Sequence, residues 1–256
     1  MATGGKASAM NHVAMLGDSI FDNGAYVGGA PDVRAQAQML LPGVTVISAA
    51  QDGAVMTDLA LQIRRIPDAV THIVVSIGGN DAIRASGVID ESASSVSAAL
   101  ERLGLIRDQF RQSYASMVGT LLSRRVPLAF CSIYDPRFPD PARRRAAANA
   151  LTLLNDVITR EVFRVGASLI DLRLICDSDE DFANPIEPSA LGGAKIARAI
   201  ARFASGDRGA LRYSPYDLMG PWCDPRKGSP LLWCPSVRVT FLLEVWHSSW
   251  TGSSAS

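Results

Sequence analysis

Three small or polar residues, Ser19, Gly53 and Asn80, each stand a few residues after an apolar or β-branched run of the chain. Because the carboxyl ends of parallel strands meet at one edge of a sheet, we expect the three loops to lie close together. Acyl transfer requires a nucleophile and two or three N–H donors directed at one point. Ser19 is the candidate nucleophile. Its own backbone N–H, the backbone N–H of Gly53 and the side-chain amide of Asn80 are the candidate oxyanion donors.

Each of these residues also has a purely structural interpretation. Gly-Asp-Ser at 17–19 favours a turn or a helix cap, Gly53 permits a positive φ, and Asn80 can cap a helix. Their occurrence after three successive strand-like runs favours the shared site.

The remaining pattern predicts the elements that position these loops. Strands are expected at 13–16, 44–48, 71–77, 126–132 and 168–172, and helices at 31–41, 57–66, 91–125 with a break near Gly104, 141–165 and 193–203. Segment 177–184 is expected to be an acidic loop. Strands separated by helices favour a parallel sheet with helices on both faces.

Composition indicates an ordinary globular protein of 256 residues, 48% of them hydrophobic. Lys+Arg and Asp+Glu number 25 each, so no net charge attracts nucleic acid or an anionic membrane. No apolar run of membrane-spanning length and no signal peptide are visible, which favours the cytoplasm. The four cysteines lack zinc spacing, and no P-loop or dinucleotide fingerprint is present, so we expect free, mostly buried thiols and neither metal nor cofactor.

Three segments are expected along the chain. Residues 1–9 resemble a leader, residues 10–205 form one domain, and residues 206–256 form an atypical tail with all four tryptophans, two cysteines and His247. This tail is interpreted as an accessory flap, as a contact between copies of the chain in a homo-oligomer, or as sequence that was never part of the ancestral fold.

The blocks Gly17-Asp18-Ser19-Ile20, Gly53, and Gly78-Gly79-Asn80-Asp81 together resemble blocks I, II and III of the SGNH, or GDSL, hydrolase family. The resemblance covers about residues 12–203. It implies a flavodoxin-like three-layer α/β/α sandwich with a five-stranded parallel sheet of order 2-1-3-4-5. It also implies metal-free hydrolysis of esters, thioesters or acetylated sugars through a serine acyl-enzyme, with Ser19 as nucleophile and Gly53 and Asn80 in the oxyanion hole.

The chain departs from this family at block V. Where the family has Asp-x-x-His, with the histidine as general base, this chain has Asn184-Pro-Ile-Glu187. Glu187 is therefore a candidate base, since burial can raise the pKa of a glutamate toward neutrality. The Asn184 amide could donate a hydrogen bond to that carboxylate.

Other groups are alternatives for the base. His12 and His72 begin their strands, and His12 lies about 20 Å from Ser19 at 3.3 Å per residue, so both are expected at the wrong edge of the sheet. His247 could act from the tail or from a neighbouring subunit. Asp22 and Asp81 could contribute a carboxylate.

Two hypotheses of function follow. The first is a cytoplasmic hydrolase of small-molecule carboxylic esters. Small residues in the loops, among them Gly24 and Ala54, suggest an open, shallow site for short-chain acyl or acetyl groups. The second is a catalytically impaired binding or assembly protein on the same fold.

Overall fold

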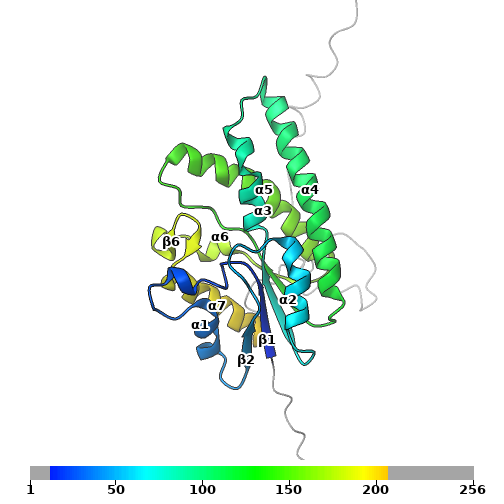
Figure 1. Cartoon of the computed structure of the whole chain (residues 1–256), viewed down its shortest axis with the longest axis vertical. Helices are drawn as coiled ribbons and strands as arrows, with labels where there is room; N and C mark the ends of the chain where they lie inside the picture. The colour runs from blue at the N-terminus through cyan, green and yellow to red at the C-terminus, as the bar shows by residue number, and fades with distance from the viewer. Residues whose placement is uncertain (1–11, 207–256) are drawn as a thin grey trace, which may run out of the picture. The chain divides into compact units, whose positions relative to one another are not determined.

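The computed structural model of the protein describes residues 12–206, and their centre is a parallel sheet (Figure 1). Its strands are β1 (His12–Gly17), β2 (Thr45–Ser48), β3 (His72–Ser76), β4 (Leu128–Cys131) and β5 (Ser168–Ile170). They lie in the order β2-β1-β3-β4-β5, and every neighbouring pair is parallel. The expected five-stranded sheet of order 2-1-3-4-5 is confirmed.

Helices cover both faces of this sheet. The α-helices are α1 (Val33–Leu40), α2 (Leu59–Arg65), α3 (Gly79–Ala85), α4 (Val96–Leu122), α5 (Pro141–Arg164), α6 (Leu172–Ile175) and α7 (Ala190–Ala204). Short 3-10 turns are η1 (Gly24–Tyr26), η2 (Met56–Asp58), η3 (Ser86–Asp90) and η4 (Asp179–Asp181). No helix within residues 12–206 has both the length and the apolar character needed to cross a membrane.

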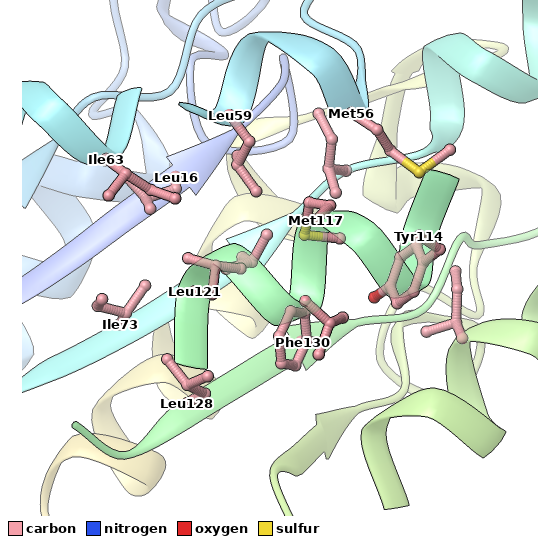
Figure 2. Close-up of a cluster of buried hydrophobic side chains, with 14 of the residues drawn as sticks. Leu16, Met56, Leu59, Ile63, Ile73, Tyr114, Met117, Leu121, Leu128 and Phe130 are labelled. Atoms are coloured by element: carbon pink, nitrogen blue, oxygen red, sulfur yellow. The ribbon is translucent and has the colours of Figure 1, made fainter. Parts of the chain in front are cut away.

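Alternation along the strands decides which helices cover which face. In β1, Val13 and Met15 pack with α1, α6 and α7, whereas Ala14 and Leu16 pack with α2, α4 and α5. Figure 2 shows the second face, where the side chains of α2 and α4 meet those of β1, β3 and β4. Both faces are buried, as a doubly covered parallel sheet requires.

Two free cysteines, Cys131 and Cys176, are buried on the α1–α7 side, as expected for structural thiols. Burial raises the pKa of both thiols, so they are held in the neutral form.

Three expectations about local structure were wrong. Helix α4 begins at Val96 and runs unbroken through Gly104, because the roughly 1 kcal/mol penalty of one helical glycine is smaller than what the packing of a long helix supplies. Helix α3 begins directly at Gly79, where no helix was expected. The acidic segment contains η4 and ends in β6 (Phe182–Asn184), which pairs antiparallel with β7 (Glu187–Pro188).

Candidate active site

Ser19 stands just past the carboxyl end of β1, in a tightly packed turn. Gly17 has φ +131°, and a Cβ there would lie 1.7 Å from the Ser76 carbonyl oxygen, so only glycine fits. The Asp18 N–H donates to that same carbonyl at 3.0 Å. The close approach of β1 to β3 thus fixes the turn that presents Ser19, which is 7% exposed.

Ser19, Asn80 and Glu187 line one pocket of about 310 Å³. Gly53 does not line it, but its loop is tied to Asn80, whose Nδ2 donates to the Ala54 carbonyl at 3.0 Å. Gly53 has φ +77°, in the left-handed region that glycine favours. The backbone N–H groups of Ser19 and Gly53 donate to no acceptor within residues 12–206.

Glu187 enters this pocket from β7 and is 7% exposed. Burial raises the pKa of its carboxyl, the nearby Ser19 hydroxyl opposes this rise, and the negative charge of Asp52 adds to it. Its Oε2 has no hydrogen-bond partner among the described residues. A buried acceptor without a partner costs free energy, which is a common feature of functional sites.

Three contacts from other parts of the chain hold the β6–β7 hairpin. The Tyr134 hydroxyl donates to the Ile186 carbonyl at 2.5 Å, and the Arg137 N–H donates to the Pro185 carbonyl at 2.7 Å. The buried Asn23 donates to the Pro188 carbonyl at 3.4 Å. The position of Glu187 is therefore set by residues that lie far from it in sequence.

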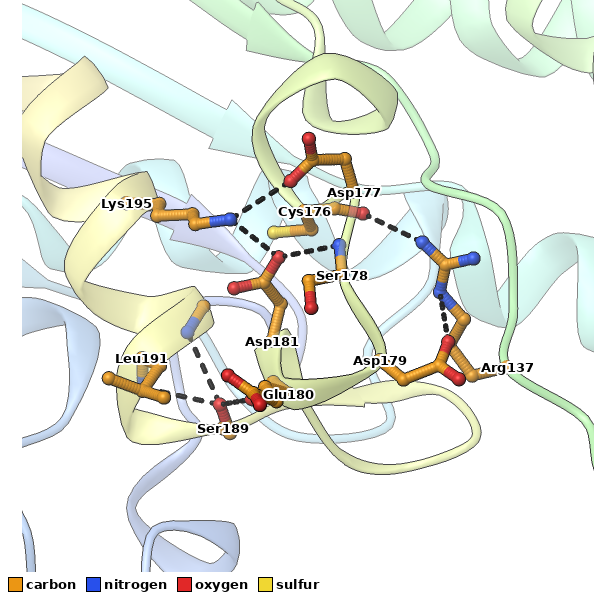
Figure 3. A network of polar contacts seen from close by, with 11 residues as sticks. Arg137, Cys176, Asp177, Ser178, Asp179, Glu180, Asp181, Ser189, Leu191 and Lys195 are labelled. Carbon is orange, nitrogen blue, oxygen red and sulfur yellow. Dashed lines mark hydrogen bonds and ion pairs between the residues drawn. The ribbon is translucent and has the colours of Figure 1, made fainter.

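A second network anchors the segments on either side of the hairpin (Figure 3). Lys195 Nζ on α7 lies 2.9 Å from Asp177 and 2.8 Å from the buried Asp181. The Ser189 N–H donates to the Asp181 carbonyl at 2.8 Å, and its hydroxyl caps α7. Both sides of the hairpin are thereby joined to the last helix.

Asn184 does not have the expected relation to Glu187. Its Oδ1 accepts the backbone N–H groups of Ile186 and Glu187, each at 3.0 Å, and its side chain is exposed. Within the described residues, its amide donates no hydrogen bond to the Glu187 carboxylate. Asn184 shapes the turn of the hairpin because a short polar side chain bonds readily to nearby backbone.

Asp18 is a site residue that the sequence reasoning missed. It lines the pocket, is 3% exposed, and accepts from the Ile20 N–H at 3.2 Å and the Ser76 hydroxyl at 3.4 Å. Burial raises its pKa to about 7, and the charge of Glu187 adds to the rise. Its place between Gly17 and Ser19 was visible, but its burial depends on contacts with β3 and α3.

The alternative carboxylates have other roles. Asp22 accepts the Asp52 N–H at 2.9 Å, and Asp81 accepts the Met56 N–H at 3.2 Å. Neither lines the pocket. Both contacts fix the loop that contains Gly53.

The histidines within the described residues lie where the sequence places them. His12 and His72 are the first residues of β1 and β3, at the opposite end of the sheet from Ser19. His72 packs edge-on against Phe203. Neither can act as base for Ser19, and His247 lies outside the described residues.

The pocket is lined by more than the small residues of the three loops. Its walls are mainly apolar side chains of α3, η3, α4 and α5. The small residues of the loops alone did not indicate this apolar lining.

The sheet order, the serine after β1 and the asparagine at the start of α3 define a class of doubly wound α/β hydrolases. Residues 15–195 match the model of the GDSL-like Lipase/Acylhydrolase family, and the chain belongs to this family.

Solved structures with a similar fold include an extracellular lipase from Streptomyces rimosus, with a TM-score of 0.58 and 17% identity over 76% of this chain and 99% of that one. A phospholipase A1 from Streptomyces albidoflavus has a TM-score of 0.58 and 16% identity over 75% of this chain and 98% of that one. A catalytic mutant of an acetylxylan esterase from Geobacillus stearothermophilus has a TM-score of 0.53 and 17% identity over 76% of this chain and 94% of that one. No curated protein sequence matches the chain.

Proposed function

We propose that the protein is a serine hydrolase of carboxylic esters that acts through an acyl-enzyme on Ser19, with Glu187 as its general base. The observation that carries this proposal is the buried Glu187 carboxylate, which has an unpartnered oxygen and lines the same pocket as Ser19 and Asn80. A carboxyl whose pKa is raised by burial is a stronger base than an exposed one.

In the first half of the reaction, Glu187 takes the proton of the Ser19 hydroxyl as Ser19 Oγ attacks the acyl carbon. The oxyanion accepts hydrogen bonds from the unused N–H groups of Ser19 and Gly53 and from the second N–H of the Asn80 amide. When the tetrahedral intermediate collapses, the C–O bond to the alcohol breaks. Glu187 then gives its proton to the departing alkoxide.

In the second half, Glu187 takes a proton from water, and the resulting hydroxide attacks the acyl-enzyme. The same donors stabilise the second oxyanion. Collapse breaks the bond to Ser19 Oγ, which recovers its proton from Glu187 and releases the carboxylic acid. No metal or redox group enters either half-reaction.

The test is the pH profile of p-nitrophenyl acetate hydrolysis by the parent, Ser19→Ala and Glu187→Gln proteins. A base must be ionised, so the rate of the parent should rise with pH through a pKa above the ordinary glutamate value of 4.5. Ser19→Ala should abolish hydrolysis, and Glu187→Gln should lower kcat about 10²- to 10⁴-fold. A Glu187→Gln protein with the parent kcat would exclude Glu187 as the base.

His247→Ala completes the series because His247 is the remaining alternative. Activity that survives in Glu187→Gln but disappears in His247→Ala would assign the base to the tail. The absence of any Ser19-dependent rate in the parent would favour the second hypothesis, a catalytically impaired binding or assembly protein.

A further inference from the structure

The pocket next to Ser19 has a polar end and a larger apolar part. Its charged lining residues within the described chain are Asp18, Arg143 and Glu187. Arg143 is half-exposed and lies 5.4 Å from the ring centre of Phe138, another lining residue, and 4.0 Å from Asp90, whose carboxylate offsets its charge. The apolar part is therefore suited to a hydrocarbon group rather than an anion.

The apolar walls come from elements on both sides of the cavity. They include Leu103 and Ile106 of α4, Ile133 after β4, and Leu151 and Leu154 of α5. Small side chains on α3 and α5, Ala82, Ala85, Ala147 and Ala150, also line the cavity and leave the space open. An acetyl group would leave most of this apolar surface in contact with water.

The proposed mechanism decides which half of an ester enters the apolar part. Glu187 protonates the departing alcohol, so the alcohol must lie beside Glu187. The charge of Asp52 acts on Glu187, and Asp52 accepts from the Tyr26 hydroxyl at 2.6 Å, so polar groups surround that side. The acyl chain then extends toward α4 and α5.

We propose that this cavity binds the acyl chain and makes the protein selective for esters of unbranched, medium-length acyl chains, rather than for acetyl esters. This inference rests on the proposed function. A volume of about 310 Å³ is near the lower limit of ligand pockets, which span about 300–1,000 Å³, and therefore sets an upper limit on chain length.

The experiment compares kcat/KM for p-nitrophenyl acetate, butyrate, octanoate and palmitate. Each buried methylene should raise kcat/KM by up to about fourfold, from the free energy of burying one CH₂ group. We expect a rise from acetate to octanoate and a fall at palmitate. A Ser19-dependent rate that is flat or falls from acetate to octanoate would overturn the proposal.

A matched pair of variants on α4 tests the location. Leu103 lines the cavity, whereas Leu105 is 67% exposed. Leu103→Asn should lower the octanoate-to-acetate ratio of kcat/KM at least about tenfold, because it places an amide against the chain. Leu105→Asn should keep the parent ratio, and equal effects of the two variants would contradict the assignment.

Direct binding separates this inference from the proposed function. Ser19→Ala protein, titrated with octanoate and acetate by calorimetry, should bind octanoate more tightly, and Leu103→Asn in that background should weaken octanoate binding. This result would support the cavity assignment even if no ester were hydrolysed. Equal affinity for the two acids would overturn the cavity assignment. In a separate comparison of hydrolysis by the parent protein, a higher kcat/KM for octyl acetate than for ethyl octanoate would assign the cavity to the alcohol and overturn the proposal.

Discussion

Two carboxyl groups, Asp18 and Glu187, share the pocket with the candidate nucleophile. Burial is the main cause of the raised pKa of each carboxyl, because transfer from water penalises the charged form. The charge of Glu187 raises the pKa of Asp18 further. Near neutral pH, Asp18 is thus partly protonated, which limits the negative charge next to Ser19.

The stability of the protein should report the ionisation of Asp18. With a pKa of about 7 in the folded state and 3.8 as the ordinary value, folded Asp18 binds its proton between these pH values while the unfolded chain releases it. Stability from this residue is therefore lost as pH rises from 4 to 7. Between pH 5 and pH 8, the loss should be about 2–3 kcal/mol at 1.36 kcal/mol per pH unit.

Asp18→Asn should remove this loss because asparagine has no ionisable group. Its Oδ1 can still accept from the Ile20 N–H and the Ser76 hydroxyl, so the local hydrogen bonds are kept. The measurement is the free energy of unfolding in urea at pH 5 and pH 8 for parent and variant. The parent should lose more stability than the variant over this interval. Equal losses would show that Asp18 ionises normally in the folded protein.

At the scale of elements, the hairpin β6–β7 determines where Glu187 lies. Its strands are too short to be stable alone, so contacts from the segment after β4, from Asn23 and from α7 hold it. A general base needs accurate placement, because small displacements of catalytic groups cost large factors in rate.

Tyr134→Phe removes the hydroxyl that donates to the Ile186 carbonyl and retains the ring that packs against Phe182. We expect a loss of about 1 kcal/mol in the free energy of unfolding, since a buried carbonyl loses its partner. We also expect a lower kcat with little change in KM, because Glu187 is displaced while the apolar part of the pocket remains. An unchanged kcat would mean that the hairpin is held without this contact.

At the scale of the whole molecule, the described residues 12–206 contain the sheet, its covering helices and the pocket lined by Ser19, Asn80 and Glu187. The proposed nucleophile, base and oxyanion donors all come from this part of the chain. The proposed mechanism therefore requires no group from residues 207–256.

A chain that ends at Gly206 should keep the parent kcat/KM for p-nitrophenyl butyrate and lose it on Ser19→Ala substitution. Circular dichroism would verify that the shortened chain is folded, and sedimentation would compare its oligomeric state with that of the full chain. A folded but inactive chain would show that the tail supplies a required group, as the His247 alternative holds. A changed oligomeric state with unchanged kcat/KM would assign the tail to assembly.

The sequence alone determined the sheet and the place of Ser19, Gly53 and Asn80 just after β1, β2 and β3. Hydrophobic periodicity is local, so runs such as 13–16 and 71–77 already indicate buried strands, and the family blocks then imply their order. The position of His12 and His72 at the other edge followed from the same strand geometry.

Only the tertiary structure decided how these loops become a site. The hairpin that carries Glu187 has strands of three and two residues, which leave no detectable period, and its position depends on Tyr134 and Asn23. The burial of Asp18 comes from β3 and α3, and the apolar cavity is formed jointly by α3, α4 and α5. Such properties depend on contacts between residues far apart in sequence, and a local sequence pattern does not predict these contacts.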